Sequence, residues 1–372
     1  MASLSSLWPG GSSGPATLEV TDTLARDLYD RSRDARLQTV RPYKNTENGL
    51  ERGMKLLTAL HDPDTGFLGF GNKSEPLSFE LHYTDDNELL QPRVATKSEN
   101  LFELVDRQVQ SHYDNSDTRE VDPAFLELAP GQHVAGTTLQ LRQRKEFERL
   151  RPIRNFRLDP DHFNIDPYRS IGREMVGPAH KADCDVLVQS VIKPAVSTAK
   201  WDRKNWWYGI DNTIDSVTGK GDSGNSVDWG QVGKEITEPI QQMGMSEQQR
   251  RRENRRRERE LLHEEGSRFT GSNDDEPVAS RSDVAKLLDK QRGMRGYHLC
   301  VRILAVSDEA EIAAQRVQDV SGMFRNFYDS RFQQGFEPVN LNSKKLYRVL
   351  QSAASRNYTD RKITFPVDTL TG

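Results

Sequence analysis

The chain has 372 residues, of which 34% are hydrophobic and 29% are charged, so any hydrophobic core must be modest for this length. Its 52 basic and 56 acidic residues nearly cancel, and the overall charge therefore predicts neither a general nucleic-acid binder nor an acidic tail. The length suffices for two domains, each with a core of its own.

Cysteine usage and the first residues bear on the cellular compartment. Cys184 and Cys300 are far apart and each lies in an apolar run, which is typical of buried free thiols in a reducing compartment. Residues 1–17 lack the charged and apolar regions of a signal peptide, and no apolar run approaches the roughly 18 residues of a membrane-spanning helix. We therefore expect a cytoplasmic protein that reaches the inner face of the membrane only through partners.

Residues 1–48 are predicted to form a disordered or weakly helical N-terminal tail. Residues 1–17 are rich in Ser, Gly and Pro, a composition that cannot bury a core. Residues 18–37 have a weak helical pattern with many charges, which is typical of an exposed helix or of one packed against a partner.

Residues 49–196 alternate between helix and strand patterns. Residues 49–61 predict a short helix, and the run 77–84 (LSFELHYT) alternates apolar and polar side chains as a strand with one buried face does. Thr96 and Glu99 form a capping box before the next helix. Strands are then predicted at 119–128 and 134–142, a helix at 168–176 and a strand at 185–192. From the first strand onward, this is the order of a ferredoxin-like split βαβ unit.

The stretch 296–328 has the clearest pattern in the chain. The apolar run 297–306 predicts a strand, and Ser307 and Asp308 then offer side-chain oxygens to the first free amides of a helix. Apolar side chains recur in that helix at steps of three and four residues, at Ala313, Val317, Val320, Phe324 and Phe327. A strand followed by a helix that lies back on it is half of an α/β layer.

The rest of the C-terminal segment repeats the order of the first unit with a reduced middle. A short strand pair is predicted at 335–342, a helix at 343–354 and a strand at 361–368, in which Pro366 indicates an edge position or a strand start. We therefore predict an α+β fold with two ferredoxin-like units in tandem, a first unit at 49–196 and a second, smaller unit at 293–372.

Between the two units, residues 197–292 are predicted to be a long charged insertion of helix and loop. The Gly-rich tract around Gly219 lacks the glycine spacing of a Walker motif and is expected to be a flexible loop. The insertion also holds a candidate nucleic-acid contact, which consists of Arg250, Arg251, Arg252, Arg255, Arg256, Arg257, Arg259, Trp206 and Trp207.

Each part of this candidate contact has two interpretations. The arginine-rich helix either contacts the phosphates of DNA or RNA, or it is a solvated face in which Glu253 and Glu260 pair with arginines four residues away. The interleaved acidic residues favour the solvated face. Trp206 and Trp207 either stack on bases or hold an extended connection against a sheet, and we favour the second interpretation.

No catalytic, cofactor-binding or metal site is predicted. His180 and Cys184 are four residues apart, but no second pair of metal ligands lies near them in the sequence. Asp159, Asp161 and Asp166 lie in a turn-rich stretch and are expected to solvate a loop. The sequence therefore predicts a protein that is not an enzyme and that needs no cofactor.

Three segments carry a resemblance to a known family: SFELHYT, VLVQSVIKPAVSTAKW and GYHLCVRILAVSDEAEIAAQRVQDVSGMFRNF. They resemble the amino-terminal region of conjugation-type (type IV secretion) ATPases of the HerA/FtsK-like superfamily, in the variety found in archaea and actinobacteria. The resemblance covers residues 50–195 and 293–372. In such proteins this region precedes a RecA-like motor whose motifs are absent from this sequence, so no catalytic residue can be carried over.

The resemblance implies a non-catalytic docking or assembly module of a conjugative DNA-transfer ATPase. The chain is then a fragment or split product, or a stand-alone relative that works without ATP. The expected partners are a P-loop motor ATPase or the chain's own missing C-terminal motor, membrane channel proteins and DNA, within an oligomeric assembly. The alternative is a nucleic-acid-binding protein that uses the arginine-rich helix and the tryptophans. A small-molecule enzyme has the least support, because the sequence shows no convergent polar constellation.

Overall fold

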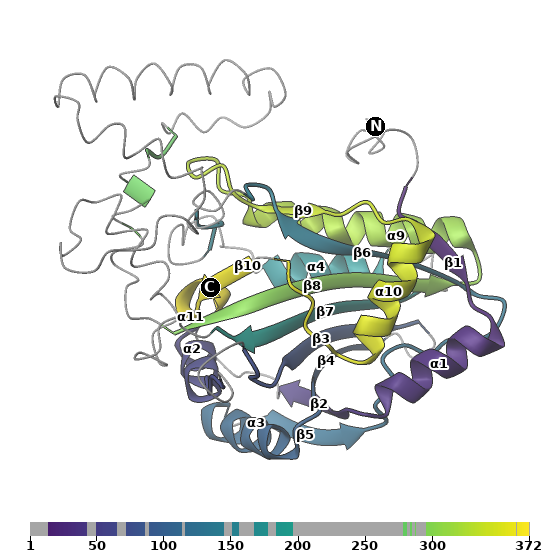
Figure 1. Ribbon diagram of the computed structural model, residues 1–372, viewed down its shortest axis with the longest axis horizontal. Coiled ribbons are helices and arrows are strands. Elements are labelled where there is room, and N and C mark those ends of the chain that lie inside the picture. The colour runs from purple at the N-terminus through teal and green to yellow at the C-terminus, as the bar shows by residue number, and fades with distance from the viewer. Residues whose placement is uncertain are drawn as a thin grey trace, which may run out of the picture. The chain divides into compact units, whose positions relative to one another are not determined.

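The computed structural model describes residues 14–42, 50–64, 72–85, 89–113, 116–144, 151–155, 167–177, 184–195, 278–280, 283–284, 287, 295–361 and 363–371. The chain divides into two units, residues 1–210 with 291–372 and residues 211–290. The first unit holds the sheet and the helices named below (Figure 1).

The first unit is built on an antiparallel sheet of ten strands (Figure 1). The strands are β1 (Thr17–Glu19), β2 (Arg36–Pro42), β3 (Leu77–Thr84), β4 (Leu89–Thr96), β5 (Ser116–Val121), β6 (His133–Leu141), β7 (Cys184–Pro194), β8 (Gly296–Ser307), β9 (Phe336–Pro338) and β10 (Ile363–Pro366). Their order is β1-β6-β8-β7-β3-β4-β2-β5, with β10 beside β8 and β9 beside β6. Every pair is antiparallel.

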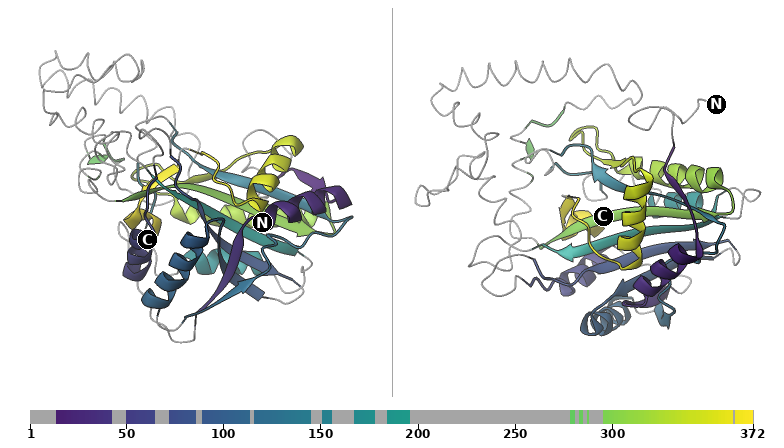
Figure 2. Two further views of the ribbon diagram at one scale, coloured as in Figure 1. Left: turned by 60° about the horizontal axis from the view of Figure 1, so that its bottom comes forward. Right: turned by 45° about the vertical axis from the view of Figure 1, so that its right-hand side comes forward.

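Helices cover both faces of the sheet, and each face has a hydrophobic core of its own (Figures 1 and 2). The helices are α1 (Asp22–Ser32), α2 (Leu50–Ala59), α3 (Glu99–His112), α4 (Pro167–Val176), α9 (Ala310–Met323), a 3-10 turn (Phe324–Phe327), α10 (Ser343–Ala354) and α11 (Val367–Thr371). The larger core joins the sheet to α2, α3, α4, α9 and α11, and the smaller core joins it to α1 and α10. Within the described residues, no helix has both the length and the hydropathy to cross a bilayer.

The α+β class predicted from the sequence is confirmed, but the strand order does not show two ferredoxin-like units in tandem. β8, the first strand of the predicted second unit, pairs along its length with β7, the last strand of the predicted first unit. Both strands are buried on their two faces, as strands in the middle of a sheet are. The residue pattern predicts local conformation correctly here, but it does not determine which strands pair.

The N-terminal residues contribute to this sheet as well. Residues 14–42, which the sequence assigns to a disordered or weakly helical tail, form β1, α1 and β2. The hydroxyl of Thr21 accepts a hydrogen bond from the Leu24 amide and so caps the start of α1. Leu28, on the inner side of α1, is fully buried, which explains how a strongly charged helix is held on the sheet.

A hairpin connection links β7 and β8 at one end of the sheet. The two strands pair from Cys184 and Ser307 to Pro194 and Tyr297, and the Ala195 amide then donates to the Gly296 carbonyl at 2.9 Å. Residues 196–294 connect these two strand ends in the sequence. The base of this connection is also held from α2, because the Tyr297 hydroxyl donates to the Leu57 carbonyl at 2.6 Å.

Gly136 marks a close approach between the sheet and α10. A Cβ atom at this position of β6 would lie 2.6 Å from Leu304 Cδ2 and 2.9 Å from Leu346 Cδ1. Both leucines are fully buried, so they cannot move aside without displacing their neighbours. We expect Gly136→Val to lower the free energy of unfolding by about 1–3 kcal/mol in urea denaturation. Gly322→Ala in α9, where an added Cβ has open space, is the control and should be neutral or slightly stabilising; equal effects of the two substitutions would contradict the prediction.

Candidate functional site

A row of polar side chains crosses the sheet on the face covered by α1 and α10. Strand register places Arg302 of β8 opposite Gln189 of β7, Gln189 opposite Glu80 of β3, and Glu80 opposite Arg93 of β4. Residues directly opposite each other in a sheet share a face, so the four side chains follow one line across four strands. We call Glu80, Gln189 and Arg302, together with Arg356 that joins them from outside the sheet, the buried polar network.

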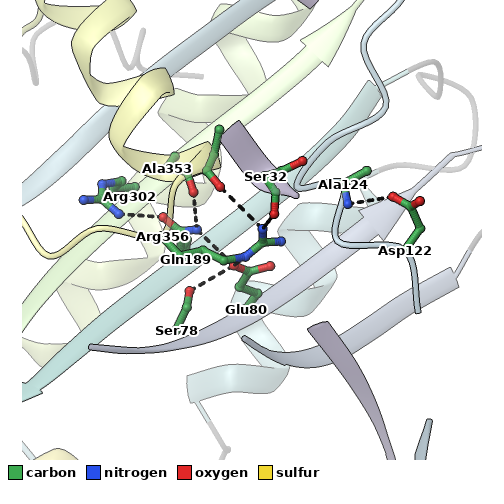
Figure 3. Close-up of polar contacts among 10 residues, drawn as sticks. Ser32, Ser78, Glu80, Asp122, Ala124, Gln189, Arg302, Ala353 and Arg356 are labelled. Carbon is green, nitrogen blue, oxygen red and sulfur yellow. Dashed lines mark hydrogen bonds and ion pairs between the residues drawn. The ribbon is translucent and has the colours of Figure 1, made fainter. Parts of the chain in front are cut away.

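Glu80 is the centre of the buried polar network (Figure 3). Its Oε1 accepts hydrogen bonds from Arg356 Nε at 3.1 Å, from Gln189 Nε2 at 3.0 Å and from Ser78 Oγ at 2.9 Å. The ion pair between Arg356 and Glu80 is shielded from water, since the two side chains are 1% and 0% exposed. A buried ion pair of this kind is strongly destabilised when either partner is removed alone.

Gln189 connects Glu80 to Arg302. The Gln189 amide oxygen accepts from Arg302 Nη1 at 2.6 Å, while its nitrogen donates to Glu80 and also to the Ala353 carbonyl in α10 at 3.0 Å. Arg302 Nη2 further donates to Thr359 Oγ1 at 2.9 Å and to the Asn357 carbonyl. Burial lowers the pKa of Arg302. The guanidinium group thus fastens the segment after α10 to the middle of the sheet.

Arg356 ties three elements together from a strained backbone position. It follows the end of α10 with a φ of 51°, in the left-handed region that usually holds glycine at a helix C-terminus. Its side chain binds Glu80 in β3, and its Nη1 donates to the Ser32 carbonyl at the end of α1 and to the Ala354 carbonyl, both at 3.4 Å. A non-glycine residue in this conformation has a backbone cost of about 1 kcal/mol, which the contacts of the Arg356 side chain offset.

Several polar atoms near Glu80 have no hydrogen-bond partner among the described residues. They are Glu80 Oε2, Arg356 Nη2, Arg93 Nε and both ring nitrogens of His82. His82 lies two residues beyond Glu80 in β3, on the same face, and is 1% exposed. Burial and, to a lesser degree, the charge of Arg93 lower the pKa of His82 to about 3. The imidazole is therefore neutral in the folded protein at neutral pH.

Because of His82, the free energy of unfolding depends on pH. An unfolded histidine has a pKa near 6.5, so between about pH 6.5 and pH 3 the unfolded chain binds a proton that the folded chain does not. Stability therefore falls as the pH drops through this window, and His82 accounts for about 2 kcal/mol of the loss between pH 7.5 and pH 5. We expect His82→Leu to remove this part of the loss, measured as the difference in the free energy of unfolding between the two pH values.

The control for this pH experiment lies in the same protein. Burial also lowers the pKa of His61, whose Nε2 donates to the Gly296 carbonyl at 2.9 Å, so a smaller acid-dependent loss should persist in His82→Leu. His61→Gln should in turn leave the contribution of His82 in place. If wild type and His82→Leu lose the same free energy on acidification, His82 does not reach its proton-free buried state.

The buried polar network holds elements of the fold together through hydrogen bonds and an ion pair. The hydrogen bonds of the buried polar network connect β3, β7 and β8 to the ends of α1 and α10 and to residues 357–359. In the part of the chain that the structure describes, no group of three or more His, Cys, Asp and Glu side chains is arranged to hold a metal ion.

The site residues predicted from the sequence belong to another part of the chain. The candidate nucleic-acid contact, Trp206 and Trp207 with the arginines of 250–259, lies outside the described residues, as do Gly219, His180 and the aspartates of 159–166. Cys184 and Cys300 are buried free thiols, as predicted. Burial raises the pKa of the Cys184 thiol to about 12.

The buried polar network was missed by sequence reasoning, although the sequence holds a signal for it. Arg302 interrupts the apolar run of β8, and a cation inside such a run needs a buried partner. The alternating pattern of residues 77–84 places Glu80 on the exposed face of a strand with one buried face. In the structure α10 and the end of α1 cover that face, and Glu80 is 2% exposed.

The chain matches a known protein-family model. The model described as a domain of unknown function (DUF8128) matches residues 10–372. This span includes the whole sheet, the buried polar network and the segment between β7 and β8. A comparison with curated proteins found no match.

Proposed function

The chain belongs to the DUF8128 family, a domain of unknown function, and we propose that it is a non-catalytic docking and assembly module of a conjugative DNA-transfer ATPase. The proposal rests on one observation, namely that the buried polar side chains bind other parts of the fold. Glu80, Gln189 and Arg302 bind one another and the elements around them, which suits a rigid scaffold. A scaffold with fixed surfaces is what an assembly module needs.

The place of the resembling segments in the fold supports the choice of partner. The segments that resemble the amino-terminal region of conjugation-type ATPases correspond to β3, β7 and β8 with α9, and these strands are neighbours in the sheet. They also supply Glu80, Gln189 and Arg302. These three segments therefore lie together in the structure, and the proposed partner is the P-loop motor of such an ATPase, in another chain or in a continuation of this one.

The hairpin between β7 and β8 supports an assembly role in a second way. Its connection, residues 196–294, leaves the sheet between two paired strand ends that further hydrogen bonds hold in place. A segment attached in this manner can contact a motor, a channel protein or a neighbouring subunit without altering the sheet that carries it.

The proposal is tested by co-purification of the full chain with a conjugation-type motor ATPase encoded in the same genome. We expect a stable complex in size-exclusion chromatography, and no ATP hydrolysis by the chain alone. A RecA-type recombinase, which shares the nucleotide-binding fold, serves as the control and should not bind. Failure to form the complex with and without nucleotide would overturn the proposal, as would specific ATP hydrolysis by the purified chain.

Nucleic-acid binding through the insertion is the second proposal, and seven arginines within residues 250–259 favour it. DNA affinity is measured against salt concentration for the full chain and for a variant with these arginines changed to glutamine. If the arginines contact phosphates, the variant should bind more weakly and show a shallower salt dependence. Equal weak binding by both proteins would remove this second proposal.

A further inference from the structure

The outer sides of α1 and α10 form one continuous surface on the molecule. The two helices lie next to each other, because Gln351 Nε2 and the Tyr347 hydroxyl of α10 donate to Asp27 Oδ2 of α1 at 3.2 and 3.4 Å. Figures 1 and 2 show both helices on the same face of the sheet. Tyr29 of α1 and Tyr347 of α10 are 44% and 39% exposed.

The two halves of this surface differ in net charge: the α1 side carries Asp22, Asp27 and Asp30 with the exposed Arg26 among them, whereas the α10 side is basic. A groove on α1 is lined by Asp22, Thr23, Arg26, Asp27 and Asp30. Asp27 is engaged by Arg31 at 3.0 Å, whereas Asp22 and Asp30 are exposed. The adjacent outer side of α10 carries Lys344, Lys345 and Arg348, all exposed, and the helix contains no acidic residue.

We propose that the chain forms a homodimer through α1 and α10, with the basic side of α10 from one copy against the α1 groove of the other. In a dimer with two-fold symmetry, α10 of each copy contacts α1 of the other copy, so every such contact occurs twice. The exposed tyrosines suit the centre of such an interface, where aromatic side chains are enriched. The inference is independent of the motor partner proposed above.

Charge complementarity favours a second copy over other occupants of this surface. A nucleic acid would be attracted by Lys344 and Arg348 but repelled by the neighbouring Asp22 and Asp30. A uniformly acidic or basic protein would meet one half of the surface with like charge, which opposes binding. A second copy would present its basic α10 to the net-acidic side of α1, and its own net-acidic side of α1 to α10.

The first test is sedimentation velocity of the full-length chain over a range of concentrations. We expect a dimer in about 50 mM salt, with a dissociation constant that rises about tenfold or more in about 500 mM salt because the interface is rich in charge. A wild-type chain that stays monomeric at every concentration would overturn this inference while leaving the motor complex untouched.

Charge reversal provides the decisive test. The triple variant Lys344→Glu, Lys345→Glu and Arg348→Glu should be monomeric, and so should the double variant Asp22→Lys and Asp30→Lys. An equimolar mixture of the two should form a heterodimer, because each variant then offers the charge that the other lacks. Continued dimerisation of either variant, or a mixture that stays monomeric, would overturn the inference.

A matched control excludes general effects of charge and of misfolding. The triple variant Lys55→Glu, Lys97→Glu and Arg107→Glu changes the charge by the same amount at exposed positions in or next to α2 and α3, which pack on the other face of the sheet. It should dimerise as the wild type does. Circular dichroism and thermal melting of all variants confirm that each one is folded before its association is measured.

Discussion

Glu80→Ala is expected to lower the free energy of unfolding by about 3–5 kcal/mol, among the largest effects of any single substitution in the chain. The change removes the oxygen that accepts hydrogen bonds from Arg356, Gln189 and Ser78. It leaves the guanidinium of Arg356 buried without a countercharge. Arg356→Ala should cost a similar amount, because Glu80 then remains buried and unpaired. Urea denaturation followed by circular dichroism measures both effects.

A double substitution separates the ion pair from the packing around it. Glu80→Met combined with Arg356→Met leaves neither charge behind, so the double variant should be more stable than the sum of the two single changes predicts, by about 1–3 kcal/mol. Additive effects would show that the two side chains do not act as a pair. Arg356→Gly should be milder than Arg356→Ala, because glycine relieves the left-handed backbone at a φ of 51°.

The exposed ion pair between Arg36 and Glu120 is the matched control. Its guanidinium and carboxylate are 2.8 Å apart, closer than in the buried pair, but its side chains are 36% and 52% exposed. Glu120→Ala should cost only about 0–1 kcal/mol, because water replaces the lost partner. A similar cost for Glu80→Ala would mean that the buried pair contributes no more than a surface contact does.

Part of the local conformation in this fold could be predicted from the sequence, although β1, β2 and β4 lie where no strand is predicted. The apolar run 297–306 corresponds to β8 (Gly296–Ser307), and the helix predicted at 343–354 is α10 (Ser343–Ala354). Both follow from side-chain periodicity, which depends on neighbours in the chain. The pairing of β8 between β6 and β7 could not be predicted in this way, because pairing is decided by packing between residues far apart in sequence.

The buried polar network could also be predicted only in part from the sequence. A cation at position 302 inside an apolar run indicates that a buried partner exists, but the partners lie on β7 and in the segment after α10. Glu80 lies between two apolar residues in an alternating pattern, as an exposed side chain of a strand does. Periodicity alone therefore predicts that it faces solvent. Only the packing of α10 and α1 over the sheet reverses that assignment.

Excising residues 196–294 is expected to leave the sheet intact and to raise the free energy of unfolding by up to about 2–3 kcal/mol. The prediction rests on the two ends of this segment, which belong to adjacent antiparallel strands joined by the hydrogen bond from Ala195 to Gly296. A short turn containing Asn-Gly can link such ends directly. Shortening the connection from about 100 residues to about four removes closure entropy of this size from the folding equilibrium.

Two replacements of the same segment distinguish loop length from specific contacts. In one, a short turn joins Ala195 to Arg295, which is kept because its carbonyl accepts a hydrogen bond from the Val367 amide at 2.9 Å. In the other, a Gly/Ser linker of the native length takes the place of residues 196–294. If the segment acts only as a connection, the linker variant should match the wild type in urea denaturation, and the short-turn variant should be more stable. A loss of stability in both variants would contradict the prediction, because residues 196–294 would then supply folding energy to the sheet and could not be a separate appendage for binding.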